Sequence, residues 1–199
     1  MSIFSAKRRV PYKSKKLLTS IANKFLRENW TNEFPVDVEV ICDNLGIGIV
    51  PIKGLNFEFG IDAFITSNFK TIYVDDDEFS KASPRYRFSI AHELGHLVLH
   101  KEFYPKGIEG LNAILKASSE YSNKDSEFQA NYFAGKILVP DEVLKEKILE
   151  LFNGNPKENA WRMSASEKEA AYNRLLKYFR ISSQTLAIRL SDVFPELVR

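Results

Sequence analysis

The sequence predicts an α+β fold, with a small β-sheet packed on helices and a helical subdomain towards the C-terminus. Three observations support this class. Apolar residues recur at helical spacing from Leu17 to Trp30, β-rich runs lie within residues 47–75, and capping residues mark several helices after residue 83. With 199 residues, the chain is long enough to bury a core without disulfides.

The composition is typical of an ordinary soluble globular protein, since 44% of the residues are hydrophobic and 27% are charged. A net charge of +2 is too small to indicate nucleic-acid or membrane binding by itself. The single cysteine, Cys42, excludes an internal disulfide and is expected to be a core thiol. We find neither a signal peptide nor an apolar run long enough to span a bilayer, so we expect a cytoplasmic protein.

Residues 1–16 are expected to form a basic N-terminal arm, because six lysines and arginines lie between residues 7 and 16. Such a run is typically solvated and partly disordered, although docking to an acidic partner or to nucleic acid is an alternative. The apolar stripe from Leu17 to Trp30 then predicts an amphipathic helix.

A short helix and three strands are expected next. Asp37 is placed to cap the helix, and Gly46 to end it in a left-handed conformation. The predicted strands lie at 47–52, 61–66 and 71–75. The acidic run 75–78 lacks the spacing of an EF-hand, so we expect a solvated turn there rather than a calcium site.

Ser83 and Pro84 suit the start of a long helix, as its N-cap and its first helical residue. The connection at 101–123 is interpreted as either a lid or a surface insertion. These elements suggest a main domain at 17–152 and a helical subdomain at 153–199. Further helices are predicted at 125–140, at 141–152, from a Ser166–Glu169 capping box to 179, and at 184–193.

The long helix carries His92, Glu93 and His96 in the pattern H-E-x-x-H. The i, i+4 spacing puts both imidazoles on one face, about 6 Å apart along the axis, where they can converge on one metal ion. Glu93 is then offset beside the ion, as a general base requires. The alternative is that these are two ordinary core or surface histidines. It is disfavoured because the flanking residues are apolar, which indicates a buried helix, and because burying an imidazole without a partner is costly in free energy. His100 lies about 12 Å along the axis from His92, too far to join them, so we expect it to support the site or the fold.

The third ligand must come from another segment, and Glu127 is our choice. It lies about 30 residues downstream on a predicted helix whose small residues allow close approach. Asn131, one turn later, is placed to hydrogen-bond a ligand. Asp125 and Glu120 are the alternatives.

These motifs resemble the ImmA/IrrE family of zinc-dependent metallopeptidases. The resemblance implies a zincin-like minimal metalloprotease fold, with one Zn²⁺ held by His92, His96 and Glu127 and with Glu93 as the base. It also implies a cytoplasmic regulatory protease that cleaves a helix-turn-helix repressor. We expect neither an N-terminal DNA-binding domain nor a C-terminal sensor domain in this chain. The matching stretches are PVDVEVICDNLGI at 35–47, GIDAFIT at 60–66, RFSIAHELGHLVLH at 87–100 and EFQANYFAGKILVP at 127–140.

The expected activity is that of a zinc metalloendopeptidase, in which a zinc-bound water activated by Glu93 attacks the scissile peptide. A second donor usually stabilises the developing oxyanion, and Tyr86, Tyr121 and Tyr132 are candidates. An edge strand at 61–66 is placed to pair with an extended substrate.

Two other classes remain open. One is a non-catalytic, metal-containing module that binds a repressor or DNA without cleavage. The other is an iron oxygenase with two histidines and one carboxylate, in which Glu93 would have no obvious role. The tail at 171–193 is similar to a helix-turn-helix with Arg189 exposed, but base readout usually needs more polar or basic side chains. We therefore expect it to pack on the main domain, and we do not expect nucleic acid as a direct partner.

Overall fold

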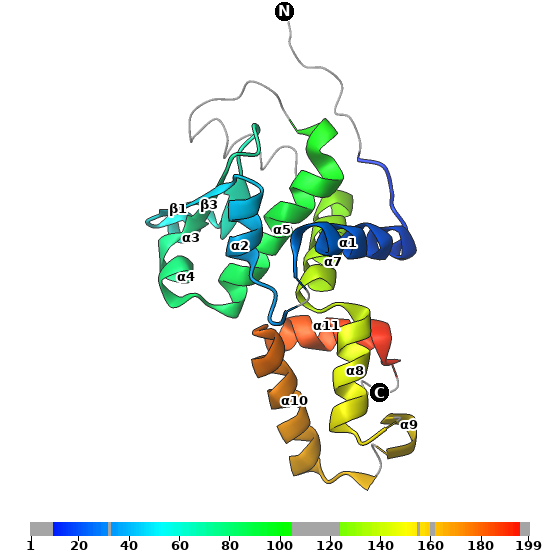
Figure 1. The fold of residues 1–199 in the computed structure, drawn as a ribbon. Coiled ribbons are helices and arrows are strands. Elements are labelled where there is room, and N and C mark those ends of the chain that lie inside the picture. Colours follow the sequence, from blue (N-terminus) through cyan, green and yellow to red (C-terminus); the bar gives the residue numbers. More distant parts are fainter. Residues whose placement is uncertain (1–9, 32, 105–123, 155, 160–161, 196–199) are drawn as a thin grey trace, which may run out of the picture.

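The computed structural model describes residues 10–31, 33–104, 124–154, 156–159 and 162–195 (Figure 1). The predicted α+β class is confirmed, with a small sheet beside a group of helices. In chain order the elements are α1 (Lys15–Asn29), α2 (Val38–Asn44), β1 (Gly48–Ile52), α3 (Leu55–Phe59), β2 (Ala63–Ile65), β3 (Thr71–Asp75), α4 (Asp76–Lys81), α5 (Pro84–His100), the 3₁₀ helix η1 (Lys101–Phe103), α7 (Lys124–Leu138), α8 (Asp141–Leu151), α9 (Pro156–Asn159), α10 (Ala165–Phe179) and α11 (Ser183–Val193).

The sheet has three strands, with β3 in the middle, parallel to β1 and antiparallel to β2. All three predicted strands are confirmed, although β2 is shorter than expected. Ile72 and Val74 of β3 are buried in the main core, while Tyr73 on the opposite face stacks on Phe64 with ring centroids 5.1 Å apart. The strand β2 forms one edge of the sheet and packs against α5.

Helix α5 also packs against α7, and the two helices are in close contact at Gly95. A Cβ at Gly95 would lie only 3.1 Å from the backbone Cα and carbonyl oxygen of Ala130, which is 0% exposed. The predicted close approach of the small-residue face of α7 is therefore confirmed. Glu127 lies three residues before Ala130, so this contact sets its side chain against α5.

Two local predictions are corrected. The acidic run is not a turn, because Asp75 caps α4 and the acidic first turn of α4 is favoured by the helix dipole. The capping box at the start of α10 joins Ser164 to Glu167, two residues earlier than predicted, because the first turn begins at Ala165. The predicted caps at Asp37 and Ser83 are confirmed, since each side chain accepts a hydrogen bond from a backbone N–H of its helix.

The described part of the predicted basic arm is attached to the core. Val10 is buried, and Lys13 donates hydrogen bonds to the carbonyl of Leu99 and to the side chain of Gln129. Helix α1 begins at Lys15, two residues before the predicted stripe. The predicted connection at 101–123 lies outside the described residues beyond residue 104, so its interpretation as a lid stays a prediction.

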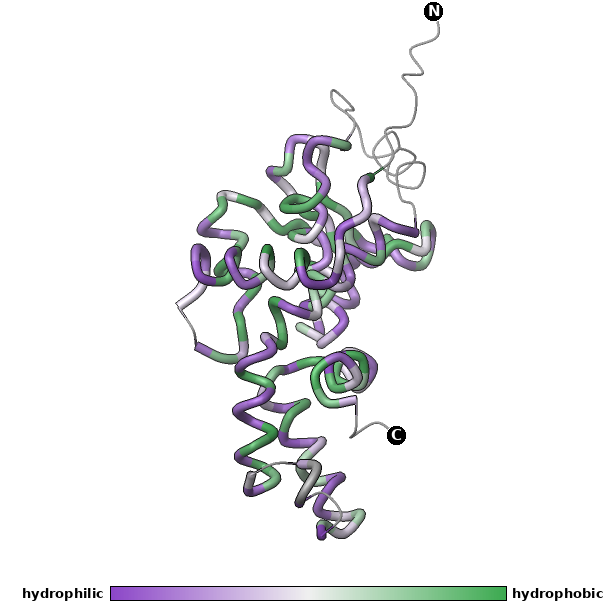
Figure 2. The backbone as a smooth tube through the Cα atoms, turned by 90° about the vertical axis from the view of Figure 1, so that its right-hand side faces the viewer, coloured by the Kyte–Doolittle hydropathy of each residue, from purple (hydrophilic) through white to green (hydrophobic). Residues whose placement is uncertain are grey.

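The C-terminal helices share the main core, which runs without a break from Leu18 of α1 to Leu190 of α11. Together α8 and α10 project from the rest of the molecule, with polar and apolar residues alternating along them (Figures 1 and 2). The division into domains at residue 152 stays a prediction. In the part of the chain that the structure describes, no helix is both long enough and apolar enough to cross a membrane.

The prediction that Arg189 is exposed is wrong: its side chain is buried. Its guanidinium donates to the carbonyl of Val139 at 3.2 Å, to Asp192 at 3.1 Å and to Asp141. Asp141 also accepts from the buried Lys136 of α7 at 2.7 Å. Because the Arg189 guanidinium has its hydrogen-bond partners inside the protein, it is not available to contact DNA bases. The same hydrogen bonds connect α11 to the C-terminal end of α7.

We predict that Gly95→Ala destabilises the protein and weakens its metal binding. Alanine favours a helix over glycine by about 1 kcal/mol, but the Cβ would press on backbone atoms that cannot move aside, and overpacking costs about 1–3 kcal/mol. Denaturant unfolding and zinc titration measure the two effects. Gly48→Ala is the control, since its Cβ would lie 3.8 Å from the Lys70 carbonyl, an ordinary contact. This role of Gly95 would be contradicted if the Gly95→Ala protein had the same stability to denaturant and the same affinity for zinc as the wild type.

Candidate metal centre

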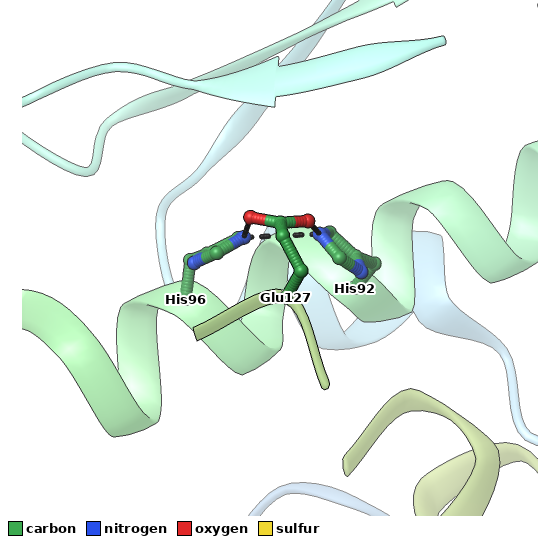
Figure 3. A group of neighbouring side chains, drawn as sticks. All are labelled: His92, His96 and Glu127. Atoms are coloured by element: carbon green, nitrogen blue, oxygen red, sulfur yellow. Dashed lines mark hydrogen bonds and ion pairs between the residues drawn. The ribbon is translucent and has the colours of Figure 1, made fainter. Parts of the chain in front are cut away.

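His92 and His96 lie one turn apart on α5, and both face Glu127 of α7 (Figure 3). The two Nε2 atoms are 2.9 Å apart. The carboxylate of Glu127 spans them, with Oε2 3.1 Å from His92 Nε2 and Oε1 3.4 Å from His96 Nε2. The three residues that the sequence suggested as ligands are thus brought together, whereas Asp125 is not part of the group and Glu120 lies outside the described residues.

This group fits a single metal ion. Two imidazole nitrogens and a carboxylate direct their lone pairs towards one point. Lone pairs so close together repel one another unless a shared proton or a cation lies between them. Two histidines and one glutamate are also the donors of a class of catalytic zinc sites, which leave a fourth position open. The described residues therefore offer a set of donors that can hold a metal ion.

The outward-facing nitrogens of both histidines are also hydrogen-bonded. His92 Nδ1 lies 2.9 Å from Asn131 Oδ1, and His96 Nδ1 lies 3.0 Å from His100 Nδ1. These contacts turn each Nε2 towards the centre of the group. Asn131 and His100, which the sequence suggested as supporting residues, are therefore in contact with the two histidines.

Glu93 lies beside the group and not within it. Its side chain is buried, and Oε2 accepts a hydrogen bond of 2.8 Å from the backbone N–H of Ile65 at the edge of the sheet. Burial raises the pKa of Glu93, while the nearby His96 and His92 and the Ile65 N–H lower it; the net direction is upward. A carboxylate of raised pKa, fixed in place, is a better proton acceptor than an exposed glutamate.

Glu127 behaves in the opposite way. Burial alone would raise the pKa of its carboxyl, but hydrogen bonds to His92 and His96 lower it far below the ordinary value. Burial lowers the pKa of His92, yet the Glu127 and Glu93 carboxylates and Asn131 raise it on balance. Burial and the charge of His96 lower the pKa of His100 to about 4, so His100 is neutral at neutral pH.

Tyr104 is a residue of this centre that sequence reasoning missed. Its ring meets the His96 ring edge-on, with centroids 5.9 Å apart. Burial and the charges of Glu93 and Glu127 raise the pKa of its phenol well above the ordinary value, so it stays a proton donor. No motif marks this position. Helix α5 ends at His100 and the 3₁₀ helix η1 lies between it and Tyr104, so helical spacing from the H-E-x-x-H motif does not predict where Tyr104 lies.

The tyrosines suggested as donors lie elsewhere or outside the described residues. The Tyr132 hydroxyl is 3.3 Å from the hydroxyl of Thr19 on α1. Tyr86 is buried in the main core, edge-on to Phe79 with ring centroids 5.7 Å apart. Tyr121 belongs to the segment that the structure does not describe.

Comparisons with known proteins agree with this geometry. The model of the IrrE N-terminal-like domain, family Peptidase_M78, matches residues 42–191. The chain belongs to this family. The resemblance predicted from the sequence is therefore confirmed, and with it a peptidase-like kind of protein. No curated protein matches the chain.

Among solved structures, the chain is similar to a Mycobacterium tuberculosis transcriptional regulator, with a TM-score of 0.54 and 19% identity. The match covers 87% of this chain and 46% of the regulator, so the chain spans about half the length of that protein. At this identity the likeness supports the fold alone.

We predict that Glu127→Ala lowers the zinc content, since it removes the one carboxylate of the three-residue group. Elemental analysis of protein purified without added metal measures this. The wild type should hold about one zinc ion per chain and the variant clearly less. Asp125→Ala, on the same helix, is the control and should keep its zinc. Equal zinc in Glu127→Ala and wild type would exclude Glu127 as a ligand and favour Asp125 or Glu120.

Proposed function

We propose that this chain is a zinc-dependent metalloendopeptidase with one Zn²⁺ on His92, His96 and Glu127. The observation that carries the proposal is the convergence of these three side chains beside the separately held Glu93. A metal site that only stabilised a fold would need no buried carboxylate next to it. The family, which is peptidase-like, supports the same function.

Glu93 is the proposed general base. When bound, the zinc ion lowers the pKa of a water molecule and polarises the scissile carbonyl. Glu93 accepts the proton of that water and passes it to the leaving amine. The hydrogen bond from Ile65 N–H holds one carboxylate oxygen and leaves the other for this transfer.

Tyr104 is the proposed second donor to the developing oxyanion. Its phenol is held protonated next to Glu93 and Glu127, and its ring packs on His96 and on Phe69. Among the described residues no hydrogen bond occupies its hydroxyl. The edge strand β2, whose Ile65 already contacts Glu93, is the proposed support for an extended substrate backbone.

The proposed substrate is a helix-turn-helix transcriptional repressor in the cytoplasm, and cleavage would relieve repression. The family resemblance supports this choice, and the buried, free thiol of Cys42 fits a reducing compartment. The main alternative is a metal-containing module that binds a repressor or DNA without cleaving anything. Burial of Arg189 disfavours its DNA-binding form.

Glu93→Gln separates the two functions. It keeps the shape of the side chain but removes the base, so we expect zinc content to be unchanged and hydrolysis to fall by about 10²–10⁴-fold. The assay follows cleavage of a purified helix-turn-helix repressor. Glu102→Gln, an exposed carboxylate on η1, is the control and should cleave at the wild-type rate. Cleavage by Glu93→Gln at the wild-type rate would rule out Glu93 as the base, and repressor binding without cleavage by any form would favour the alternative.

Tyr104→Phe tests the second donor. Loss of one donor to an oxyanion costs about 10²–10³-fold in kcat, and we expect KM and zinc content to change little because the ring remains in place. Tyr132→Phe is matched to it, since its hydroxyl pairs with Thr19, and it should keep the wild-type kcat. If Tyr104→Phe keeps full kcat, the oxyanion donor is another group.

A further inference from the structure

A chain of hydrogen bonds leads from His96 away from the metal centre to the N-terminal segment. His96 Nδ1 lies 3.0 Å from His100 Nδ1, and His100 Nε2 lies 3.3 Å from Gln129 Oε1. Gln129 then donates from Nε2 to the carbonyl of Pro11 at 2.9 Å, and its Oε1 accepts from Lys13 Nζ at 3.4 Å. His96, His100 and Gln129 are 7%, 2% and 1% exposed, so solvent does not substitute for these partners.

The direction of each hydrogen bond in this chain is determined by chemistry. A carbonyl oxygen only accepts, so His100 must carry its proton on Nε2 to bond Gln129. A neutral imidazole has one N–H, which leaves His100 Nδ1 as an acceptor. The proton between the two rings therefore sits on His96 Nδ1, and His96 Nε2 is left with a free lone pair towards Glu127.

The orientation of the Gln129 amide is set from outside. Proline has no backbone N–H, and the Pro11 carbonyl only accepts, so it requires the amide nitrogen of Gln129. The Lys13 ammonium only donates, so it requires the amide oxygen. Reversing the amide would break both contacts, and each of them comes from the segment before α1.

We propose that Pro11 and Lys13, through Gln129 and His100, hold His96 in the tautomer that binds metal, so that the N-terminal segment is part of the metal centre. Gln129, His100 and the segment are positioning groups, since none of them faces the metal. His92 depends on Asn131 instead, which lies on α7 and has no link of this kind to the segment. A partner that displaced residues 11–13 would loosen one ligand only. The inference rests on the proposed metal site but not on peptide hydrolysis.

Nitrogen NMR of the imidazoles in metal-free protein tests the proposal directly. The chain has three histidines, so three rings need to be assigned. In the wild type, at a pH where the rings are neutral, we expect His100 to be protonated at Nε2 and unprotonated at Nδ1. In Gln129→Leu the His100 signals should move to the average of two tautomers, while the His92 signals stay in place. Gln129→Glu loses the donor to Pro11 but keeps an oxygen that accepts from His100 Nε2, so His100 should keep its proton on Nε2. A merely structural role for Gln129 would predict no such difference between the two variants.

Zinc affinity, measured by competition with a chelator, gives the second readout. Partners of metal-bound histidines are typically worth about 10–100-fold in metal affinity. We expect a loss of this size in Gln129→Leu, a smaller loss in Lys13→Met, and a change of only a few-fold at most in Gln129→Glu. Lys13→Met keeps the test valid should Gln129→Leu fail to fold, because Lys13 is only partly buried.

The outcomes separate the two proposals. An unchanged His100 tautomer in both Gln129→Leu and Lys13→Met would overturn this inference even if zinc binds and peptides are cleaved. If the protein binds zinc and the variants show the expected tautomer changes but no form cleaves peptides, this inference is supported and only the proposed peptidase function is contradicted.

Discussion

The close packing of α5 on α7 at Gly95 and Ala130 is the constraint on which the centre depends. A Cβ at Gly95 would lie 3.1 Å from the backbone of Ala130, so the two helices approach as closely as a side-chain-free position allows. This proximity lets the short side chain of Glu127 reach across to two histidines of the other helix. A wider spacing would leave His92 and His96 facing each other without a carboxylate.

The same packing places two glutamates in environments that shift their pKa in opposite directions. Hydrogen bonds to two imidazoles lower the pKa of Glu127, whereas burial dominates at Glu93 and raises its pKa. Two carboxyl groups with pKa values driven apart are the pattern expected when one serves as an anion and the other exchanges protons. The hydrogen bond from Ile65 connects this chemistry to the edge of the sheet.

Helix α7 carries most of the support for the centre. Glu127, Gln129 and Asn131 lie along it, and between them they contact His92, His96 and His100 of α5. Its C-terminal end is fixed by buried charges, where Asp141 accepts from both Lys136 and Arg189. Buried ion pairs contribute little net stability, but removing one partner is costly, so such a group specifies where a helix lies.

The sequence by itself determined the fold class, the strands, most helices and the family. Hydrophobic periodicity, helix caps and the H-E-x-x-H motif are local patterns, because each depends on the chemistry of side chains that lie within a few turns of one another in the chain. It also suggested Glu127, because this residue lies about 30 residues downstream on a helix whose small residues allow that helix to pack closely against α5. It gave no indication of Tyr104, of the path from His100 to Pro11, or of the burial of Arg189. Those depend on contacts between residues far apart in the chain, such as Lys13 with Gln129 and Arg189 with Asp141, and only the packing of the helices decides which side chains meet.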